Sequence, residues 1–410
     1  MIPTVVRRLG VLLGVGFLLL ACYPLDIFAD GQVEWIDGVR VVNLWGAPYE
    51  MGRQHGELLR DEVRGSVQQA LGYCRRYLKI PFIGAWAADW WLGSAWRTLQ
   101  PFVPQDRLEE LRGLADGSGV SLADLYRLHA LPERTYACSN FAVWGPATID
   151  GRLIHVRNLD WNFTLGIQRY ATVFVMHPIG HAAFVSVGWA GFIGVLTGIN
   201  EHEVSIGQVG AQTQAASFRG EPFPFVMRRV LEQAHDVDDA ATMIRTATRT
   251  TGINYVIGDA ATRQAIAIET NRVYACVFKD DDPLEHAVSY ARPIPSAVFR
   301  ADTAINPQIR AQQLASNGNP RRPGLEPPSG SAYEIRYLGQ AAGIMAFYGQ
   351  IDAEKAQYIA KTVAPESNIQ SVIFSWPDAW IANASSTTRA SQTAYHHLQL
   401  QQLLADPPVN

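Results

Sequence analysis

The sequence of 410 residues has little cysteine and little net charge, and each shortage excludes a class of protein. Only four cysteines are present and no CxxC spacing occurs, so a zinc cluster is not expected. The net charge of -4 does not indicate the excess of basic residues that is typical of nucleic-acid-binding proteins. Hydrophobic residues make up 48% of the chain and charged residues 18%, which is typical of a folded protein rather than a disordered one.

The chain also lacks, near its start, a hydrophobic run long enough to cross a membrane. The apolar run covers only residues 9–21, which is short for a spanning helix. Arg7 and Arg8 precede it, and a basic segment before a short apolar one is typical of an export signal. The run ends in Leu-Leu-Ala-Cys22, which is similar to a bacterial lipoprotein box, where the cysteine is lipidated after cleavage. We therefore expect a signal peptide over residues 1–21, lipidation of Cys22, and an exported protein anchored in the cell envelope; an ordinary cleaved signal remains the alternative.

The three remaining cysteines, Cys74, Cys138 and Cys276, cannot all pair with one another. Exported proteins tolerate disulfides, so a bond between Cys74 and Cys276 stays open. Cys74 lies on a helix-like stretch, however, and nothing in the pattern brings it to Cys276. An unpaired cysteine in an exported chain suggests a reactive thiol.

The pattern along the chain predicts one domain in two parts, with no internal repeat and no long linker. Residues 22–137 are expected to be mostly helical, with short strands over 33–44 and helices over 51–78, 86–99, 105–116 and 121–129. Four tryptophans in the second helix form a stripe that suits a core, an acyl pocket or a membrane-facing patch: Trp86, Trp90, Trp91 and Trp96.

From residue 138 to 410 the spacing of hydrophobic residues changes to the alternation that is typical of strands. Short β-rich runs are predicted over 141–144, 153–157, 171–176, 183–187 and 204–209, and a second set over 253–258, 265–269 and 273–278. Helices are expected over 223–234, 237–248, 310–315 and 333–345, and closing strands over 371–374 and 379–382. Helices, strands, helices and strands in this order favour an α+β layered fold.

The segment around Cys138 carries the most chemistry. Cys138 begins a strand, and Asp150-Gly151 is a strong hairpin signal that leads into a second strand with Arg157 near its end. Antiparallel pairing brings the end of the second strand to the start of the first, so Cys138, Arg157 and Asp160 share one end of the hairpin. A cation near a thiol lowers the pKa of the thiol and favours the thiolate, and the carboxylate can hold a cation.

No obvious general base accompanies this thiol. His155 shares a face with Arg157 but lies further from the cysteine, and no local signature supports a Cys–His pair. Cleavage of the Ala137–Cys138 bond would supply a base, because the freed α-amine has an ordinary pKa of about 7.7–8.0. Arg157 nearby would lower the pKa of that amine toward neutrality.

The stretch Cys138-Ser-Asn-Phe-Ala-Val-Trp-Gly, together with Arg157-Asn-Leu-Asp-Trp, resembles the N-terminal-nucleophile hydrolase family of isopenicillin N acyltransferase. It is more distantly similar to the choloylglycine hydrolases and acid ceramidase. Residues 46–56, residues 110–119 and Gly198-Ile-Asn-Glu fit the same family, so the resemblance spans about residues 35–385. Ala137 and Glu203 depart from the pattern, because the family commonly has glycine at both places.

The resemblance implies a four-layer αββα sandwich with a helical N-terminal segment and autocatalytic cleavage before Cys138. It implies that Arg157 and Asp160 hold the active site and that Asn254 supplies an oxyanion donor. It also implies a distal arginine, for which Arg336 is the match and Arg300 the runner-up. No metal or other cofactor is required by this chemistry.

The sequence therefore predicts an autoproteolytic cysteine amidohydrolase or acyltransferase. The Cys138 thiol would attack a small-molecule N-acyl amide and form an acyl-thioester, which water or a second amine then resolves. Penicillin-type side chains, N-acyl amino acids, bile-salt-like conjugates, N-acyl lipids and acyl-homoserine lactones all suit this chemistry. Two rivals remain: a cysteine hydrolase with a histidine base and no self-cleavage, and a non-catalytic, lipid-anchored binding protein of the same fold. The oligomeric state is left open.

Overall fold

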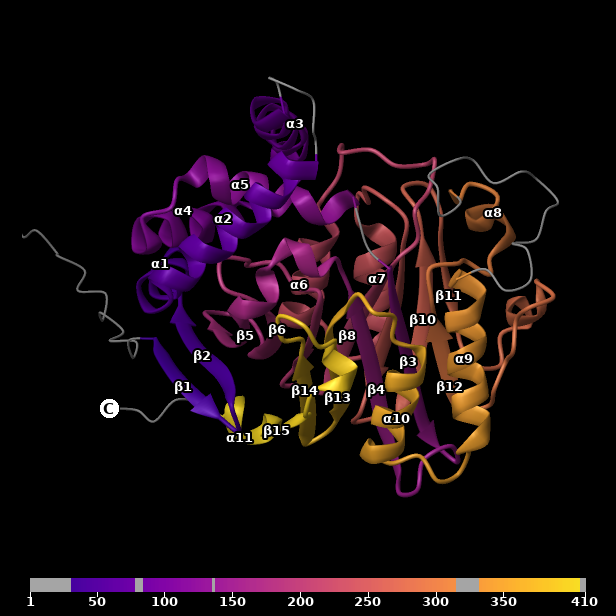
Figure 1. Ribbon diagram of the computed structural model, residues 1–410. Helices are drawn as coiled ribbons and strands as arrows, with labels where there is room; N and C mark the ends of the chain where they lie inside the picture. Colours follow the sequence, from indigo (N-terminus) through magenta and orange to yellow (C-terminus); the bar gives the residue numbers. More distant parts are fainter. Residues whose placement is uncertain (1–30, 78–83, 135–136, 315–331, 406–410) are drawn as a thin grey trace, which may run out of the picture.

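Two β-sheets lie face to face in the computed structural model, which describes residues 31–77, 84–134, 137–314 and 332–405 (Figure 1). The larger sheet has the strand order β1-β2-β5-β6-β7-β8-β9-β10-β11, and the smaller one β12-β3-β4-β13-β14-β15. All neighbours pair antiparallel except β2 and β5, which run parallel. Strands β3 and β4 of the smaller sheet contact β8 and β9 of the larger one.

The strands of the larger sheet have these bounds: β1 Gln32–Ile36, β2 Val39–Gly46, β5 Ala171–Pro178, β6 Phe184–Trp189, β7 Thr197–Asn200, β8 Val204–Gly210, β9 Ile253–Asp259, β10 Gln264–Thr270 and β11 Ala275–Phe278. Those of the smaller sheet are β3 Ala137–Gly145, β4 Gly151–Asp160, β12 Ala297–Arg300, β13 Asn368–Ser375, β14 Asp378–Asn383 and β15 His396–Gln399.

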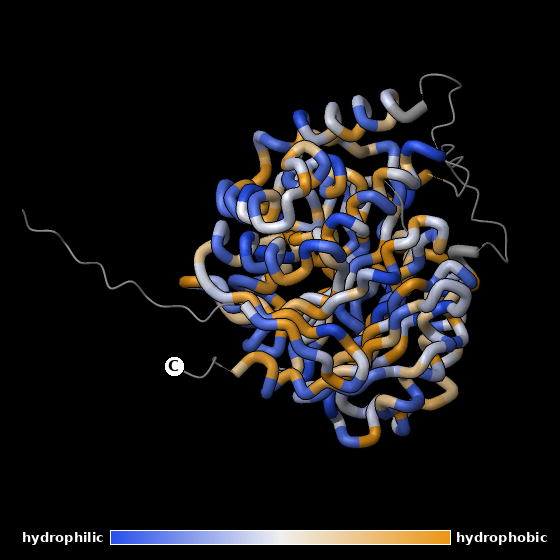
Figure 2. Tube along the Cα trace, turned by 60° about the vertical axis from the view of Figure 1, so that its left-hand side comes forward, coloured by the Kyte–Doolittle hydropathy of each residue, from blue (hydrophilic) through white to orange (hydrophobic). Residues whose placement is uncertain are grey.

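Helices cover the outer face of each sheet. Helices α6 (Phe223–Gln233) and α7 (Val237–Thr246) pack on the larger sheet, and α9 (Ala332–Ala346) and α10 (Ala353–Val363) on the smaller one. The layers are thus α, β, β and α, and the predicted four-layer α+β sandwich is confirmed. Hydrophobic segments gather in the interior strands (Figure 2), because strands buried on both faces have no polar side to present.

A further group of helices lies beside the sandwich at the end of the larger sheet. It comprises α1 (Pro48–Leu58), α2 (Arg60–Tyr77), α3 (Gly84–Leu99), α4 (Gln105–Ser118) and α5 (Leu122–Ala130). The short helices α8 (Pro307–Arg310) and α11 (Leu400–Leu403) complete the described set. The part before residue 137 is not purely helical, since β1 and β2 extend the larger sheet.

Two predicted helices differ in detail from those observed. The single helix expected over 51–78 is two helices, because the backbone leaves the helical region at Leu59. The helix expected over 310–315 is confined to Pro307–Arg310, because Thr213 pairs with Gln313 in an isolated bridge.

The tryptophan stripe of α3 splits between two environments. Trp96 is buried and stacks on Tyr126, with ring centroids 4.6 Å apart. Trp86 and Trp90 are 69% and 57% exposed, so they belong neither to the core nor to an enclosed pocket.

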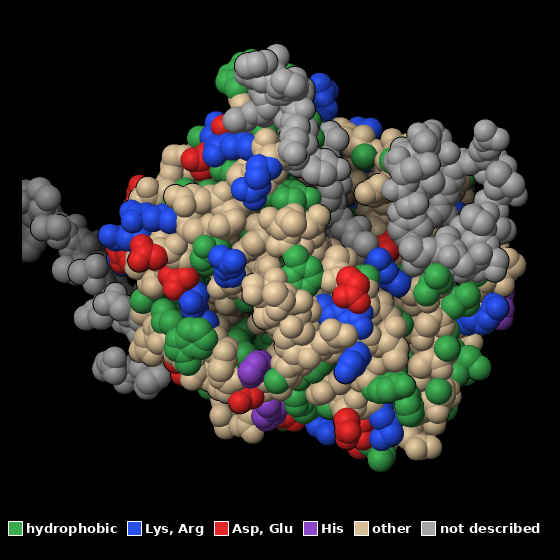
Figure 3. Space-filling model, in the orientation of Figure 1, with side chains coloured by type: hydrophobic (Ala, Val, Ile, Leu, Met, Phe, Trp, Pro, Cys, Tyr) green, Lys and Arg blue, Asp and Glu red, His purple; other side chains and the backbone are tan. Residues whose placement is uncertain are grey.

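On the face drawn in Figure 3, positive and negative side chains are interspersed, in keeping with the small net charge.

Glu203, where the sequence departs from the family pattern, lies in a turn whose backbone conformation favours glycine. Its φ of 64° lies in the left-handed region, where glycine costs least. The turn between β7 and β8 thus keeps the shape for which glycine is suited, despite its different residue.

Cys74 and Cys276 are free thiols in the structure, so the disulfide left open by the sequence is not formed. The expected signal peptide over 1–21 and the expected lipidation site Cys22 lie outside the described residues. Among the described helices, none is both long and apolar enough to cross a membrane.

Helices α1 and α4 cross at glycines, which explains two of the glycine-bearing segments found in the sequence. A Cβ on Gly113 would lie 2.0 Å from the carbonyl oxygen of Tyr49, and one on Gly52 would lie 2.0 Å from that of Glu110. Such distances leave no room for any side chain, so glycine here sets how closely the two backbones approach.

We predict that Gly113→Ala destabilises the protein by about 3 kcal/mol, because a methyl group must force the two helix backbones apart. Gly72→Ala is the matched control. A Cβ at Gly72 on α2 meets only the end of the flexible Arg76 side chain, at 3.5 Å. The control should be neutral or stabilising by up to about 1 kcal/mol. Urea unfolding measures both, and equal stabilities would refute the close crossing.

Candidate active site

Cys138 lies near the start of β3, in the central hairpin of the smaller sheet. Strand β3 pairs with β4 so that Cys138 faces Leu159, and Ala137 faces Asp160. The hairpin turns at Gly151, whose φ of 74° a glycine adopts without strain. The structure therefore brings Cys138, Arg157 and Asp160 to one end of the hairpin, where the sequence placed them.

Arg157 is fully buried and connects the thiol to the opposite sheet. Its Nη2 donates to Cys138 Sγ at 3.5 Å and its Nη1 to Thr197 Oγ1 at 2.9 Å. Its Nε donates to the carbonyl oxygen of Gln208 at 3.3 Å. Because partners on β7 and β8 fix the guanidinium, it cannot move away from the sulfur without breaking contacts between the sheets.

The thiol is nevertheless neutral in these surroundings. Burial raises the pKa of Cys138 to about 11, and the opposing effect of Arg157 does not overcome it. Arg157 lowers the pKa of the thiol, as the sequence predicts, but desolvation outweighs this effect. A buried neutral thiol needs a base that removes its proton during attack.

The backbone nitrogen of Cys138 has its own acidic partner. Its N–H donates to Asp302 Oδ1 at 3.0 Å. Asp302 lies just after β12, the edge strand that pairs with β3. Both the sulfur and the nitrogen of one residue are therefore bound by ionisable side chains.

Arg336 on α9 joins the two acidic residues of the site. Its Nη1 lies 2.8 Å from Asp302 Oδ2 and 3.3 Å from Asp160 Oδ2. Asp160 also accepts a hydrogen bond at Oδ1 from the Asn368 amide, at 3.1 Å. The three charged side chains form a compact cluster beside the nucleophile.

Both carboxyl groups of this cluster titrate well above their ordinary range. Burial raises the pKa of Asp160 to about 7 and that of Asp302 to about 6, while Arg336 lowers both. The effect of burial on these pKa values outweighs that of Arg336, because this one cation is shared between two carboxyl groups. Perturbed acids of this kind are typical of functional sites.

The structure separates the two candidates for the distal arginine. Arg336 contacts Asp160 and Asp302, whereas Arg300 is buried against Glu269 at 2.8 Å and Glu285 at 2.7 Å. Arg300 also lies over the Phe278 ring. These contacts of Arg300 belong to an internal ion-pair network and not to the site around the thiol.

Asn254, expected as an oxyanion donor, is buried on β9 and uses its amide elsewhere. Its Nδ2 donates to the carbonyl oxygens of Ala301, at 2.9 Å, and Thr303, at 3.1 Å. These peptides flank Asp302, so Asn254 positions the segment that carries the carboxylate. Its role as an oxyanion donor stays a prediction, and it would require one of these bonds to be released.

His155 does not contact the thiol in the part of the chain that the structure describes. Its ring nitrogens lie 2.8 Å from Ser205 Oγ and 2.8 Å from Asn140 Oδ1. Burial lowers the pKa of His155 to about 3, so the imidazole is neutral and fully engaged. It is a poor candidate for the base of Cys138.

Asp302 and Asn368 were not found from the sequence. Asp302 stands two residues after Arg300, in a segment with no turn or motif signal of its own. Asn368 occupies a register shift at the start of β13, where its amide also bonds the carbonyl oxygen of Gln370. Only the pairing of β12 with β3 and of β13 with β4 brings them to Cys138.

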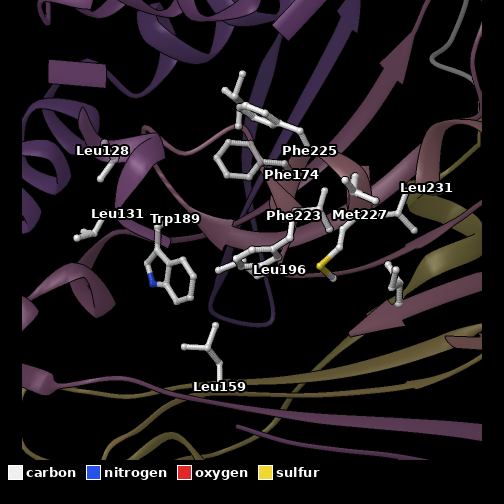
Figure 4. Close-up of a cluster of buried hydrophobic side chains, with 14 of the residues drawn as sticks. Leu128, Leu131, Leu159, Phe174, Trp189, Leu196, Phe223, Phe225, Met227 and Leu231 are labelled. Carbon is white, nitrogen blue, oxygen red and sulfur yellow. The ribbon is translucent and has the colours of Figure 1, made fainter. Parts of the chain in front are cut away.

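An apolar pocket lies beside the cluster. Leu128, Leu131, Trp189 and Leu196, labelled in Figure 4, are among its lining residues, together with Trp161, which directly follows Asp160. Cys138 and its strand partner Leu159 belong to the same buried apolar cluster. The lining is almost entirely apolar, so it suits hydrocarbon.

Residues 147–299 match the family model described as acyl-coenzyme A:6-aminopenicillanic acid acyl-transferase. The family resemblance expected from the sequence is therefore confirmed. The matched segment contains Arg157, Asp160 and Asn254, whereas Cys138, Asp302 and Arg336 lie outside it.

Two curated relatives and one solved structure illustrate the similarity. The chain is 29% identical to protein dcd1B of Dictyostelium discoideum over 63% of this chain, and spans 55% of the length of that relative. It is 22% identical to the N-acylethanolamine-hydrolyzing acid amidase of Cavia porcellus, over 56% of this chain and 67% of that protein. The Caenorhabditis elegans ortholog of that amidase superposes with a TM-score of 0.42 at 16% identity, over 58% of this chain and 92% of the other.

We predict that Arg336→Met lowers stability by about 3–5 kcal/mol at pH 8, because two buried carboxylates lose their shared cation. Arg336 stabilises the ionised carboxyl groups, so its contribution is present above about pH 7. It fades as the pH falls through about 7 and 6, the raised pKa values of Asp160 and Asp302. At pH 5 the loss should be much smaller.

Urea unfolding of the variant and the wild type at pH 8 and pH 5 measures this difference. Arg112→Met is the control, since Arg112 is exposed on α4 and should change stability little at either pH. A loss from Arg336→Met that is the same at both pH values would contradict the assigned ion-pair cluster.

Proposed function

Because residues 147–299 match the acyl-coenzyme A:6-aminopenicillanic acid acyl-transferase family model, we propose that the chain is a cysteine amidase or acyltransferase of the N-terminal-nucleophile type. Its substrate would be a small N-acyl amide, and its nucleophile Cys138. The observation that carries the proposal is the double engagement of Cys138, with Arg157 at the sulfur and Asp302 at the nitrogen.

The first step of the proposal is self-cleavage at Ala137–Cys138. The Cys138 thiol attacks the carbonyl carbon of Ala137, and the acyl group moves from nitrogen to sulfur. Water then hydrolyses the thioester, which leaves a carboxylate on Ala137, a free thiol, and an α-amine on Cys138. That amine remains within reach of Asp302, whose carboxylate can orient it by accepting one of its hydrogens.

In the catalytic cycle the α-amine of Cys138 serves as the base. It takes the thiol proton as the sulfur attacks the substrate carbonyl, then gives that proton to the departing nitrogen as the C–N bond breaks. This base suits the site because burial keeps the thiol protonated until attack. Arg157 beside the sulfur stabilises the negative charge that develops there.

The apolar pocket favours an apolar acyl group for the substrate. Trp161 lines the pocket and directly follows Asp160 of the cluster, so an acyl chain seated there would end near Cys138. The acyl-thioester is then resolved either by water, which releases the acid, or by a second amine, which accepts the acyl group. A relative from Cavia porcellus is named for hydrolysis of N-acylethanolamines, which supports an N-acyl amide here.

We also propose that the protein is exported and anchored to the cell envelope through lipidated Cys22. The support is the sequence alone: two arginines, the apolar run over residues 9–21 and the Leu-Leu-Ala-Cys ending. Metabolic labelling with an alkyne fatty acid should mark the wild type and leave Cys22→Ser unmarked. Equal labelling of both would contradict lipidation at this residue.

The proposed self-cleavage predicts two polypeptides in protein produced without its signal. Intact mass should place the junction between Ala137 and Cys138, and N-terminal sequencing of the second fragment should begin with Cys138. Cys138→Ala should remain one chain and lose amidase activity by on the order of 10³-fold or more, since both steps need the thiol. Cys276→Ala, which removes a partly exposed free thiol elsewhere, is the matched control and should behave as wild type.

The two rival functions give different outcomes in the same preparation. A single chain that a thiol-directed acyl probe labels at Cys138 would indicate a cysteine hydrolase that does not cut itself. A single chain that the probe leaves unlabelled would indicate a binding protein of the same fold. Either outcome would overturn the self-processing mechanism.

A further inference from the structure

Phe192 separates the apolar pocket from a second cavity. It lies in the loop between β6 and β7, and its ring lines both spaces. The second cavity is small and includes Phe174, Met176 and Phe184 in its wall. The Phe192 ring thus lies between the two spaces.

The ring of Phe192 is fixed in place by its neighbours. It stacks on the His129 imidazole with ring centroids 4.9 Å apart and an interplanar angle of 11°. On another side Gly194 lies so close that a Cβ there would be 3.0 Å from Phe192 Cζ. A ring held between an imidazole and a backbone has little room to rotate out of the way.

The backbone on both sides of Phe192 is held by two buried histidines. Gly191 N–H donates to His55 Nε2 at 2.9 Å, and Ile193 N–H donates to His129 Nε2 at 3.0 Å. His129 Nδ1 lies 2.8 Å from the Leu125 carbonyl oxygen, so Nδ1 carries the proton and Nε2 accepts. Burial lowers the pKa of His55 to about 3 and of His129 to about 4, which keeps both rings neutral acceptors.

Unlike the apolar pocket, the second cavity has charged side chains at one end. Arg228 and Glu110 lie in its wall, and the Arg228 guanidinium is paired with Glu110 at 2.7 Å and with Glu232 at 2.9 Å. This ion-pair network is completely buried, so the charged end of the cavity is closed. Apolar space beyond Phe192 is therefore limited to the part lined by its aromatic and methionine side chains.

We infer that Phe192 sets the maximum length of the acyl chain that the enzyme accepts. The inference rests on the proposed function, since it takes the apolar pocket as the acyl site of Cys138. A chain that fills the pocket meets the face of a fixed ring, and each further methylene group must stay outside or displace the ring. Removal of the ring opens the second cavity to the end of the chain.

The test is a series of N-acyl amides with one fluorogenic amine and straight acyl chains that grow by two carbons. For the wild type, kcat/KM should rise with chain length and then fall at one length. In Phe192→Ala the rise should continue beyond that length, by about fourfold for each methylene group that finds new apolar space. The preferred chain should therefore be longer by at least one member of the series.

A second variant works in the opposite direction and guards against misfolding of the first. Ala70 on α2 is buried and lines the same pocket, so Ala70→Leu should shorten the preferred chain. Phe102→Ala removes a phenylalanine that is 37% exposed and should leave the profile of the wild type unchanged. Phe192→Leu keeps an apolar side chain of smaller size and should shift the profile in the same direction as Phe192→Ala, by less.

The outcomes separate the two proposals. A wild type inactive on the whole series overturns the proposed function and, with it, the role of Phe192. An active wild type whose profile stays unchanged in both Phe192 variants overturns the role of Phe192 alone. Opposite shifts for the Phe192 and Ala70 variants support it.

Discussion

The Arg157 guanidinium is buried where the two sheets meet, and each of its nitrogens has a partner there. Nε and Nη1 bond β8 and β7 of the larger sheet, while Nη2 reaches Cys138 on the smaller one. An unpaired guanidinium in such a place would cost several kcal/mol, so the sheets must approach in the one register that satisfies it. The position of the thiol is therefore part of how the sandwich packs.

The two carboxyl groups beside the thiol share one cation. Arg336 serves both Asp160 and Asp302, and the pKa values of both carboxyl groups stay high because one cation cannot offset the burial of two acids. The same arrangement supplies an acceptor for the nitrogen of Cys138. In an enzyme that uses its own amine as base, the nitrogen must be held as firmly as the sulfur. Here Arg157 on β4 binds the sulfur, and Asp302, just after β12, binds the nitrogen.

The apolar pocket depends on polar groups that are not part of it. His55 and His129 bind the amides around Phe192, and the network of Arg107, Glu110, Arg228 and Glu232 lies behind them. These buried polar groups are satisfied by one another, which makes the loop that walls the pocket rigid. A rigid wall allows a pocket without specific polar contacts to discriminate by length.

The sequence by itself determined the layered α+β fold, the family resemblance, and the hairpin that joins Cys138 to Arg157 and Asp160. The hairpin could be predicted because it depends on residues close together in the chain. A turn at Asp150-Gly151 and the two-residue period of the strands suffice to pair them. Only the tertiary structure decided that burial keeps the thiol protonated, that Arg336 rather than Arg300 reaches the site, and that Asp302 binds the Cys138 nitrogen. It also turned the amide of Asn254 toward Ala301 and Thr303. Burial, and contacts between residues far apart in the chain, have no local signature, so they arise only when β12, β9 and α9 pack around the hairpin.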